Sequence, residues 1–180
     1  MSEQLQTDLA IEAAAIADVP QLVAVHLDAE IHRFPNKVGS QSELPTASEV
    51  KTFHNNNNSD IRFTRLYEQS ILHNPHEIVQ TVKLGSLIVG FSLYNSRTHW
   101  LGSLYIAPKF QGLGIGTLLL QNCLRSAEGS PMSLWTSDQT PSVAFYTKHG
   151  FSIDGPAPLS SCPQITPSKK LPLISMTHPG

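Results

Sequence analysis

The segment Gln111–Gly116 reads QGLGIG, with glycines at alternate positions between an apolar stretch and a run with helical spacing. The first N–H groups of a helix have no partners within the helix, and they carry the positive end of its dipole. Glycines let the backbone approach a ligand without an intervening Cβ. A strand, a glycine turn and a helix in this order therefore predict an anion site, above all for a diphosphate, to which Thr117 adds a hydroxyl. A tight turn with incidental glycines is the alternative.

Two common phosphate motifs do not fit this segment. A P-loop requires GxxxxGK[ST], and no lysine follows Gly116. A dinucleotide fingerprint requires GxGxxG, but in GLGIGT the third glycine comes one position early. The pattern that does fit is Gln-x-x-Gly-x-Gly, formed by Gln111, Gly114 and Gly116.

Two stretches together resemble a known family. LYIAPKFQGLGIGTLLLQNCL is similar to the acetyl-coenzyme A motif of the GCN5-related N-acetyltransferase (GNAT) superfamily, in which a strand ending in apolar-x-Pro precedes [Gln/Arg]-x-x-Gly-x-[Gly/Ala] and a helix. About thirty residues later, SDQTPSVAFYTKHGFSI resembles the second motif of that family, a helix that carries Phe-Tyr and ends in Gly-Phe. Here these are Phe145, Tyr146, Gly150 and Phe151. The resemblance covers residues 86–153 well.

The resemblance implies one GNAT-like domain over residues 1–180, of the α/β (α+β) class. Its central sheet would be mixed and mostly antiparallel, with splayed middle strands and helices on both faces. Residues 1–75 would form a helical region on the acceptor side, residues 76–153 the coenzyme A-binding core, and residues 154–180 a loop and a closing strand.

The family resemblance also implies how the coenzyme would bind. The N–H groups of the glycine turn and the helix start would hold the pyrophosphate, and the preceding strand would pair with the pantetheine arm. Backbone N–H groups near Tyr105 and Ile106 would polarise the thioester carbonyl, as in an oxyanion hole. Gln139 stands where the family often has a cofactor-contacting Asn. The implied coenzyme-binding residues are Leu104, Tyr105, Ile106, Gln111, Gly112, Leu113, Gly114, Ile115, Gly116, Thr117 and Gln139.

Tyr146 matches the tyrosine that gives a proton to the departing thiolate in many family members. A phenol with a pKa of about 10 is protonated at neutral pH and suits this role. Phe145 and Tyr146 are adjacent on a predicted helix and should face different ways. We therefore expect Phe145 in the core and Tyr146 in the site.

The general base is not identified by the sequence. Many family members carry an acid on the strand before the glycine turn, and this chain has Gly102-Ser103 there. His99, Glu77 and Asp28 are candidates by residue type only. No base is needed if the amine binds neutral or loses its proton to water.

The expected activity is transfer of an acetyl or acyl group from acetyl-coenzyme A to an amine of a small molecule or peptide, by direct attack in a ternary complex. The acceptor would contact residues 28–72, where acids suit a cationic amine but also suit a solvated surface. The alternatives are a non-catalytic acyl-coenzyme A-binding module and a doubly wound nucleotide-binding protein. The hairpin EIVQTVKLGSLIVGFSLY argues against the second of these.

Local patterns predict the elements that position these residues. We expect helices over 16–34, with Asp18 as N-cap and Pro20 in its first turn, over 47–54, with Ser48 as cap, and over 61–72, after a turn at Asn55–Asn58. A further helix should follow the glycine turn, and a short one should span 140–150. Strands are expected over 9–14, 77–84, 87–95, 97–108, 131–137, 151–155 and 171–178. The proline-rich stretch 156–170 is predicted to be a loop.

Composition narrows the function classes. The chain has 180 residues, 40% of them hydrophobic, and a net charge of −2, which fits one domain with its own core and no basic stripe for nucleic acid. The sequence contains no membrane-spanning apolar run, and its first residues are polar and acidic, unlike those of a signal peptide. Neither nucleic-acid nor membrane binding is therefore expected. Cys123 and Cys162 are isolated, which predicts reduced thiols in the cytoplasm. No metal is expected, because the HxxH pair His73 and His76 has no clear third ligand. A homodimer is compatible with the sequence.

Overall fold

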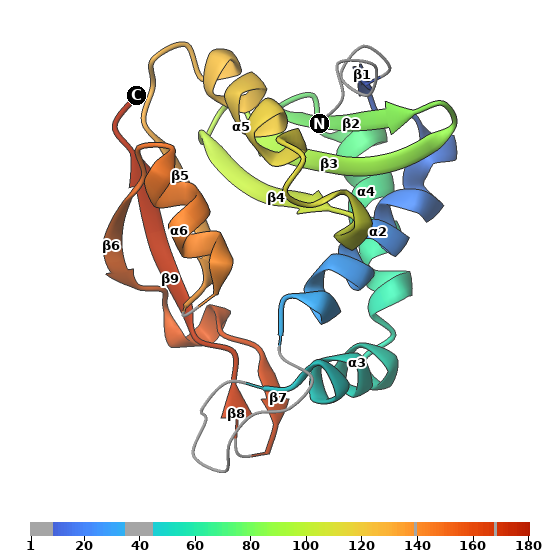
Figure 1. Cartoon of the computed structure of the whole chain (residues 1–180), viewed down its shortest axis with the longest axis vertical. Helices are drawn as coiled ribbons and strands as arrows, with labels where there is room; N and C mark the ends of the chain where they lie inside the picture. The colour runs from blue at the N-terminus through green and yellow to red at the C-terminus, as the bar shows by residue number, and fades with distance from the viewer. Residues whose placement is uncertain (1–8, 35–44, 139, 168) are drawn as a thin grey trace.

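The computed structural model describes residues 9–34, 45–138, 140–167 and 169–180. Its core is a seven-stranded sheet of mixed, mostly antiparallel strands (Figure 1). In spatial order the strands are β1 (Leu9–Ala13), β2 (Glu77–Leu84), β3 (Leu87–Asn95), β4 (Trp100–Ile106), β5 (Met132–Ser137), β9 (Leu173–His178) and β6 (Ser152–Pro156). The predicted fold class is therefore confirmed.

Helices cover both faces of the sheet. In chain order they are α2 (Val19–His32), α3 (Ala47–Asn56), α4 (Ser59–His73), α5 (Ile115–Ser126) and α6 (Pro141–Lys148), with short 3₁₀ turns at Ile16–Asp18, Pro108–Phe110 and Leu159–Ser161. Helices α2 and α4 pack against β2 and β3 on one face, and α5 packs on the other (Figure 1). Strand β3 is buried along nearly its whole length because both of its faces are covered. Among the described residues, no helix has the length and apolar character needed to cross a bilayer.

The middle of the sheet opens between β4 and β5. These strands are parallel neighbours, yet in the described part of the chain only Trp100 and Ser133, at the start of both strands, are in register. Beyond this point the strands diverge, as Figure 1 shows. The opening matters for function because it leaves one edge of β4 without a strand partner.

Three local predictions are corrected by the structure. Thr46, not Ser48, caps α3: its hydroxyl accepts from the Glu49 N–H at 3.2 Å, and the Glu49 carboxylate accepts from the Thr46 N–H at 2.7 Å. Helix α4 begins at Ser59, two residues early, because the chain turns at Asn57–Asn58, where Asn58 takes a left-handed conformation. The stretch predicted as a loop contains a short antiparallel pair, β7 (Gln164–Thr166) and β8 (Lys169–Lys170).

The predicted N-cap Asp18 does precede α2, but its carboxylate does not cap that helix. It accepts from the Ala15 N–H at 2.9 Å and pairs with the Lys83 ammonium at 3.2 Å. Pro20 lies in the first turn of α2, as predicted.

Candidate active site

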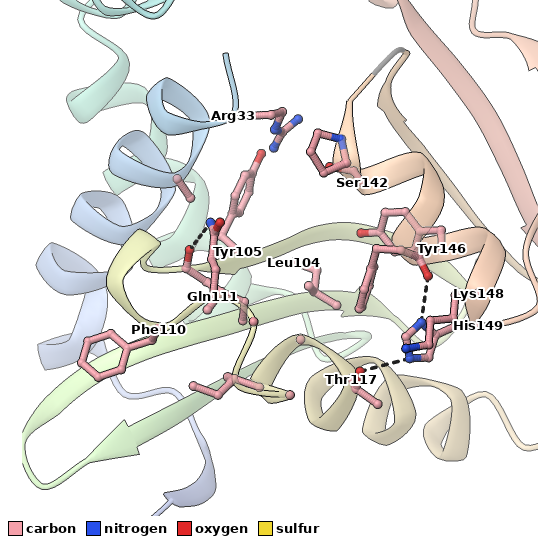
Figure 2. A pocket seen from close by; sticks show the side chains of 18 of the residues that line it. Arg33, Leu104, Tyr105, Phe110, Gln111, Thr117, Ser142, Tyr146, Lys148 and His149 are labelled. Atoms are coloured by element: carbon pink, nitrogen blue, oxygen red, sulfur yellow. Dashed lines mark hydrogen bonds between the residues drawn. The ribbon is translucent and has the colours of Figure 1, made fainter. Parts of the chain in front are cut away.

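A cavity of about 500 Å³ lies between the start of α5, the second half of β4 and the helix α6 (Figure 2). Residues from the end of α2 complete its wall, including Ala29 and Arg33. The cavity therefore brings together the glycine-rich motif and the motif that carries Tyr146, which lie about thirty residues apart in the sequence.

The glycine turn has the conformation of a bare anion cradle. Gly112 and Gly114 have φ values of +75° and +81°, a region that favours glycine. A Cβ built on either residue would meet no protein atom within 4 Å, so it would extend into open space. The N–H groups of Ile115, Gly116 and Thr117 start α5, and no acceptor for them is found among the described residues. Three free donors at the positive end of a helix suit a phosphate.

Gln111 and Leu113, which were expected to bind the coenzyme, make contacts within the protein instead. The Gln111 N–H already donates to the Pro108 carbonyl at 3.3 Å, and its side-chain amide donates to the Ile106 carbonyl at 3.1 Å. Gln111 therefore fastens the turn to the end of β4 rather than offering a free backbone donor. Leu113 does not line the cavity but packs against the apolar cluster of β2, β3 and α5.

The free edge of β4 supplies backbone donors. The Ala107 N–H donates to the Val89 carbonyl of β3 at 2.9 Å. Because hydrogen bonds alternate along an antiparallel pair, the Tyr105 N–H also faces β3, and the N–H groups of Leu104 and Ile106 face the opening towards β5. Of the two residues expected to polarise a carbonyl, Ile106 has a suitable N–H and Tyr105 does not.

Tyr146 lies in the cavity wall and points into the cavity in Figure 2. The residue is 8% exposed, and no hydrogen bond of its hydroxyl is found among the described residues. Burial raises its pKa above the ordinary value, with a smaller opposing effect from the Arg33 charge, so the phenol keeps its proton through the neutral range.

The structure corrects only part of the expected division between Phe145 and Tyr146, because Tyr146 lines the cavity as expected but Phe145 lines it too. Both line the cavity, and Tyr146 is the more buried of the two, packed edge-on against Phe145 and Phe151 at centroid distances of 5.1 and 5.4 Å. The short helix α6 lies along the cavity, so two adjacent side chains can both reach it.

Four basic residues of the wall were not predicted as coenzyme ligands: His32, Arg33, Lys148 and His149. Lys148 and His149, at the end of α6, face the start of α5, where the Thr117 hydroxyl lies 3.1 Å from His149 Nε2. The His149 Nδ1–H donates to the Phe145 carbonyl at 2.8 Å, which leaves Nε2 to accept from Thr117. Arg33 points into the cavity from the other side, with its guanidinium over the Tyr105 ring and 3.0 Å from the Ser137 hydroxyl.

The remaining expected residues are Gln139 and the three candidate bases. Gln139 is outside the described residues. None of the three candidate bases lines this cavity: His99 Nδ1 lies 2.7 Å from the Tyr94 hydroxyl, Asp28 pairs with His32 at 3.2 Å, and Glu77 begins β2. A cluster of metal-binding side chains is not found in the described part of the chain.

Comparisons with known proteins agree with this geometry. The model of the Acetyltransferase (GNAT) family matches residues 45–151. The peptidyl-lysine N-acetyltransferase YjaB of Salmonella typhimurium is 30% identical over 91 residues, which are 51% of this chain and 57% of that relative. The chain thus matches little more than half the length of this relative.

Solved structures share the fold over nearly the whole chain. The PaiA N-acetyltransferase of Thermoplasma acidophilum, in complex with coenzyme A, has a TM-score of 0.69 at 16% identity and covers 96% of this chain and 99% of its own. Apo YjaB of Escherichia coli has a TM-score of 0.63 at 18% identity, over 96% and 98% of the two chains. Together with the family match over more than half of the sequence, the glycine turn and the splayed strands place this chain in the GNAT family of N-acetyltransferases.

Proposed function

We propose that this protein transfers an acetyl group from acetyl-coenzyme A to an amine of a peptide or small molecule, by direct attack of the amine in a ternary complex. The observation that carries the proposal is the continuous cavity that joins the free N–H groups of α5, the open edge of β4 and the Tyr146 hydroxyl. A binding site for a long phosphorylated thioester and a proton donor thus share one wall. The peptidyl-lysine activity named for the related YjaB supports an alkylamine as the acceptor.

The residues present fit the coenzyme. Its diphosphate would lie on the N–H groups of Ile115, Gly116 and Thr117, where Gly112 and Gly114 leave the backbone bare. Its pantetheine arm would run along the free edge of β4. The cavity volume of about 500 Å³ falls in the range of cofactor sites.

Each residue then has a physical task. The Ile106 N–H would donate to the thioester carbonyl oxygen and stabilise the charge that develops there as the amine nitrogen attacks the carbon. As the carbon–sulfur bond breaks, Tyr146 would donate its proton to the sulfur, and the nitrogen would release its own proton to solvent or to a neighbouring group. Tyr146 would regain its proton from the same pool, so the enzyme ends each turnover unchanged.

Coenzyme binding can be tested by thermal unfolding. A ligand that binds only the folded state increases the free energy of unfolding, by about 2.7 kcal/mol at a ligand concentration of 100 Kd, and so raises the melting temperature. We expect acetyl-coenzyme A to raise the Tm by several degrees, and NAD and ATP to do much less. Equal shifts with all three ligands, or no shift with the coenzyme, would count against the proposal. Thiol release in the presence of a panel of amines then separates an enzyme from an acyl-coenzyme A-binding module without activity.

Lys148 provides a second test, of the anionic end of the coenzyme. Its exposed ammonium lies on the cavity wall beside the start of α5. Lys148→Ala should weaken coenzyme A binding about two- to fivefold, since one solvent-exposed charge contact contributes at most about 1 kcal/mol. The effect should shrink at high salt. Lys51→Ala, an exposed lysine of α3 outside the cavity, is the control, and equal effects of both changes on calorimetric affinity would remove Lys148 from the site.

A further inference from the structure

The cavity of about 500 Å³ described above is called the coenzyme cavity below. Two further cavities, each of about 440 Å³, adjoin it at Tyr105, which lines all three. One lies in the opening between β4 and β5, between Gly102, Trp100 and Trp135, and is called the strand cavity below. The other lies among α2, α3 and α4 and is called the helix cavity. Glu30 lines both, and among the described residues no other acidic side chain lines any of the three cavities.

The Glu30 carboxylate is held by two histidines. Its Oε2 lies 3.4 Å from His26 Nε2 and 3.1 Å from His54 Nε2. The opposite ring nitrogens meet hydroxyls, with His26 Nδ1 2.6 Å from the Tyr67 hydroxyl and His54 Nδ1 3.0 Å from Ser59 Oγ. If each hydroxyl donates to Nδ1, both Nε2 atoms carry hydrogens that point to Glu30. His54 Nε2 is fully buried and has no hydrogen-bond partner among the described residues, so its 3.1 Å contact with the carboxylate is mainly electrostatic.

Stacking fixes the cluster in place. The His26 ring lies between the Phe63 and Tyr105 rings, at centroid distances of 3.8 and 4.0 Å. A ring stacked on both faces cannot turn without breaking these contacts, so Glu30 keeps its orientation. No hydrogen bond to its Oε1 is found among the described residues, and one carboxylate oxygen is therefore available to a ligand.

Glu30 shares the strand cavity with Gly102, one of the two residues that stand where many members of this family carry an acid on β4. Resting on the proposed function, we propose that Glu30 of α2 supplies the missing negative charge and binds the ammonium group of the acceptor in the strand cavity. Trp100 and Trp135 pack edge-to-face there, at a centroid distance of 5.0 Å, and offer aromatic surface that also favours a cation.

Glu30 acts as an anchor rather than as the final proton acceptor. Burial opposes its ionisation, but the N–H groups of His26 and His54, together with the Arg33 charge, hold its pKa well below the ordinary value. Even an ordinary glutamic acid and an alkylammonium differ by about six units in pKa, so transfer of the proton to this carboxylate is strongly unfavourable. Burial also lowers the pKa of His26 and makes it a poor store for the proton. The proton therefore leaves to water.

Arg33 separates the anchor from the coenzyme cavity. It lines both the coenzyme cavity and the strand cavity, and the described residues give it no ion pair with Glu30. Its positive charge disfavours a second cation beside the thioester, which favours the neutral, nucleophilic amine at the point of attack. Each of the two further cavities is lined by one arginine, Arg33 or Arg62, so charge alone does not distinguish them. The strand cavity is the better place for the acceptor because it lies in the opening along β4, beside Gly102.

The test is Glu30→Gln, which removes the charge and keeps the shape of the side chain. Steady-state kinetics are measured at saturating acetyl-coenzyme A. The alkylammonium acceptor is the best of three compounds: an acetyl-capped lysine tripeptide, tyramine or spermidine. Aniline, whose amine is neutral at pH 7, is the comparison. KM for the alkylammonium should rise about 10- to 100-fold, as when a hydrogen bond to a charged group is lost, while kcat/KM for aniline changes less than about twofold. Asp28→Asn, an exposed carboxylate on the same helix with 56% of its side chain accessible, should behave as the wild type.

The outcomes separate this inference from the proposed function. An unchanged KM for the alkylammonium in Glu30→Gln, or an equal loss with aniline, would overturn the anchor and leave the acetyltransferase in place. If the wild type acetylates aniline but none of the three ammonium acceptors, the anchor is likewise overturned. If none of these amines is acetylated, calorimetry of the three ammonium probes with coenzyme A present decides: binding at least tenfold weaker in Glu30→Gln supports the anchor, and equal or absent binding overturns it. The proposed acetyltransferase activity is tested separately: it is rejected if a wider panel of amines also yields no acetylated product.

Discussion

Gly114→Val is expected to abolish coenzyme binding while the protein remains folded. At φ +81° the new side chain would project into open space on the cavity side of the turn, where no protein atom lies within 4 Å of the Cβ. It would stand in the position that the diphosphate needs, and it would break two or three hydrogen bonds between backbone N–H groups and phosphate. At about 1.5–3 kcal/mol for each hydrogen bond to a charged group, the Kd for acetyl-coenzyme A should rise about 100-fold or more.

The control for Gly114→Val must carry the same backbone strain. A branched residue at positive φ costs about 1–3 kcal/mol wherever it occurs. Gly85, in the turn between β2 and β3, has φ +61°, is exposed, and likewise has no atom within 4 Å of a built Cβ. Gly85→Val should therefore lower the Tm to a similar extent and bind the coenzyme normally. If a folded Gly114→Val protein binds as well as Gly85→Val, the phosphates lie elsewhere.

The glycine turn could be predicted from the sequence because its chemistry is local. The positive φ of Gly112 and Gly114 and the free donors of α5 arise within one short segment, so residue type and spacing determine them. The same holds for Gly150, with φ +90° after α6. The contact of the Gln111 side chain could not be predicted in this way, because its hydrogen bond to the Ile106 carbonyl depends on how the turn folds back on β4.

The Glu30 cluster could not be predicted in this way. His26 and Glu30 are one turn apart on α2, but His54 comes from α3, Tyr67 from α4 and Tyr105 from β4. Each of these residues has an ordinary explanation by itself, as a surface charge or a core ring. Only the packing of three helices against the sheet brings them together, and no local pattern encodes that packing.

The short pair β7–β8 was missed for a related reason. Prolines and polar residues dominate 156–170, which favours a loop. The pair is stabilised from outside, because Ile165 and Leu171 pack on Phe34, just after α2, and on Val50 of α3. Tertiary contacts here outweigh the weak local preference.

Tyr146→Phe is expected to lower kcat about 100-fold or more, with acetyl-coenzyme A affinity within about twofold of the wild type. A general acid contributes about 100- to 10,000-fold, and it acts on the departing sulfur in the transition state rather than on the bound ground state. The substitution keeps the ring, which packs on Phe145 and Phe151, and no hydrogen bond of the hydroxyl to another described residue is lost. Tyr94→Phe is the matched control, since that buried hydroxyl bonds His99 Nδ1 at 2.7 Å and lines none of the cavities.

The pH profile gives Tyr146 a second signature. Burial raises the pKa of its hydroxyl, so the acid form persists above the ordinary phenol value of about 10. Ionisation of Tyr146 should therefore leave the wild-type rate unchanged through neutral pH and lower it only in strongly alkaline solution. The Phe variant should lack that alkaline decrease, because its residual rate depends on water as the acid. Turnover of Tyr146→Phe at the wild-type rate, with the alkaline limb unchanged, would assign the proton to another donor and leave Tyr146 as a packing residue of α6.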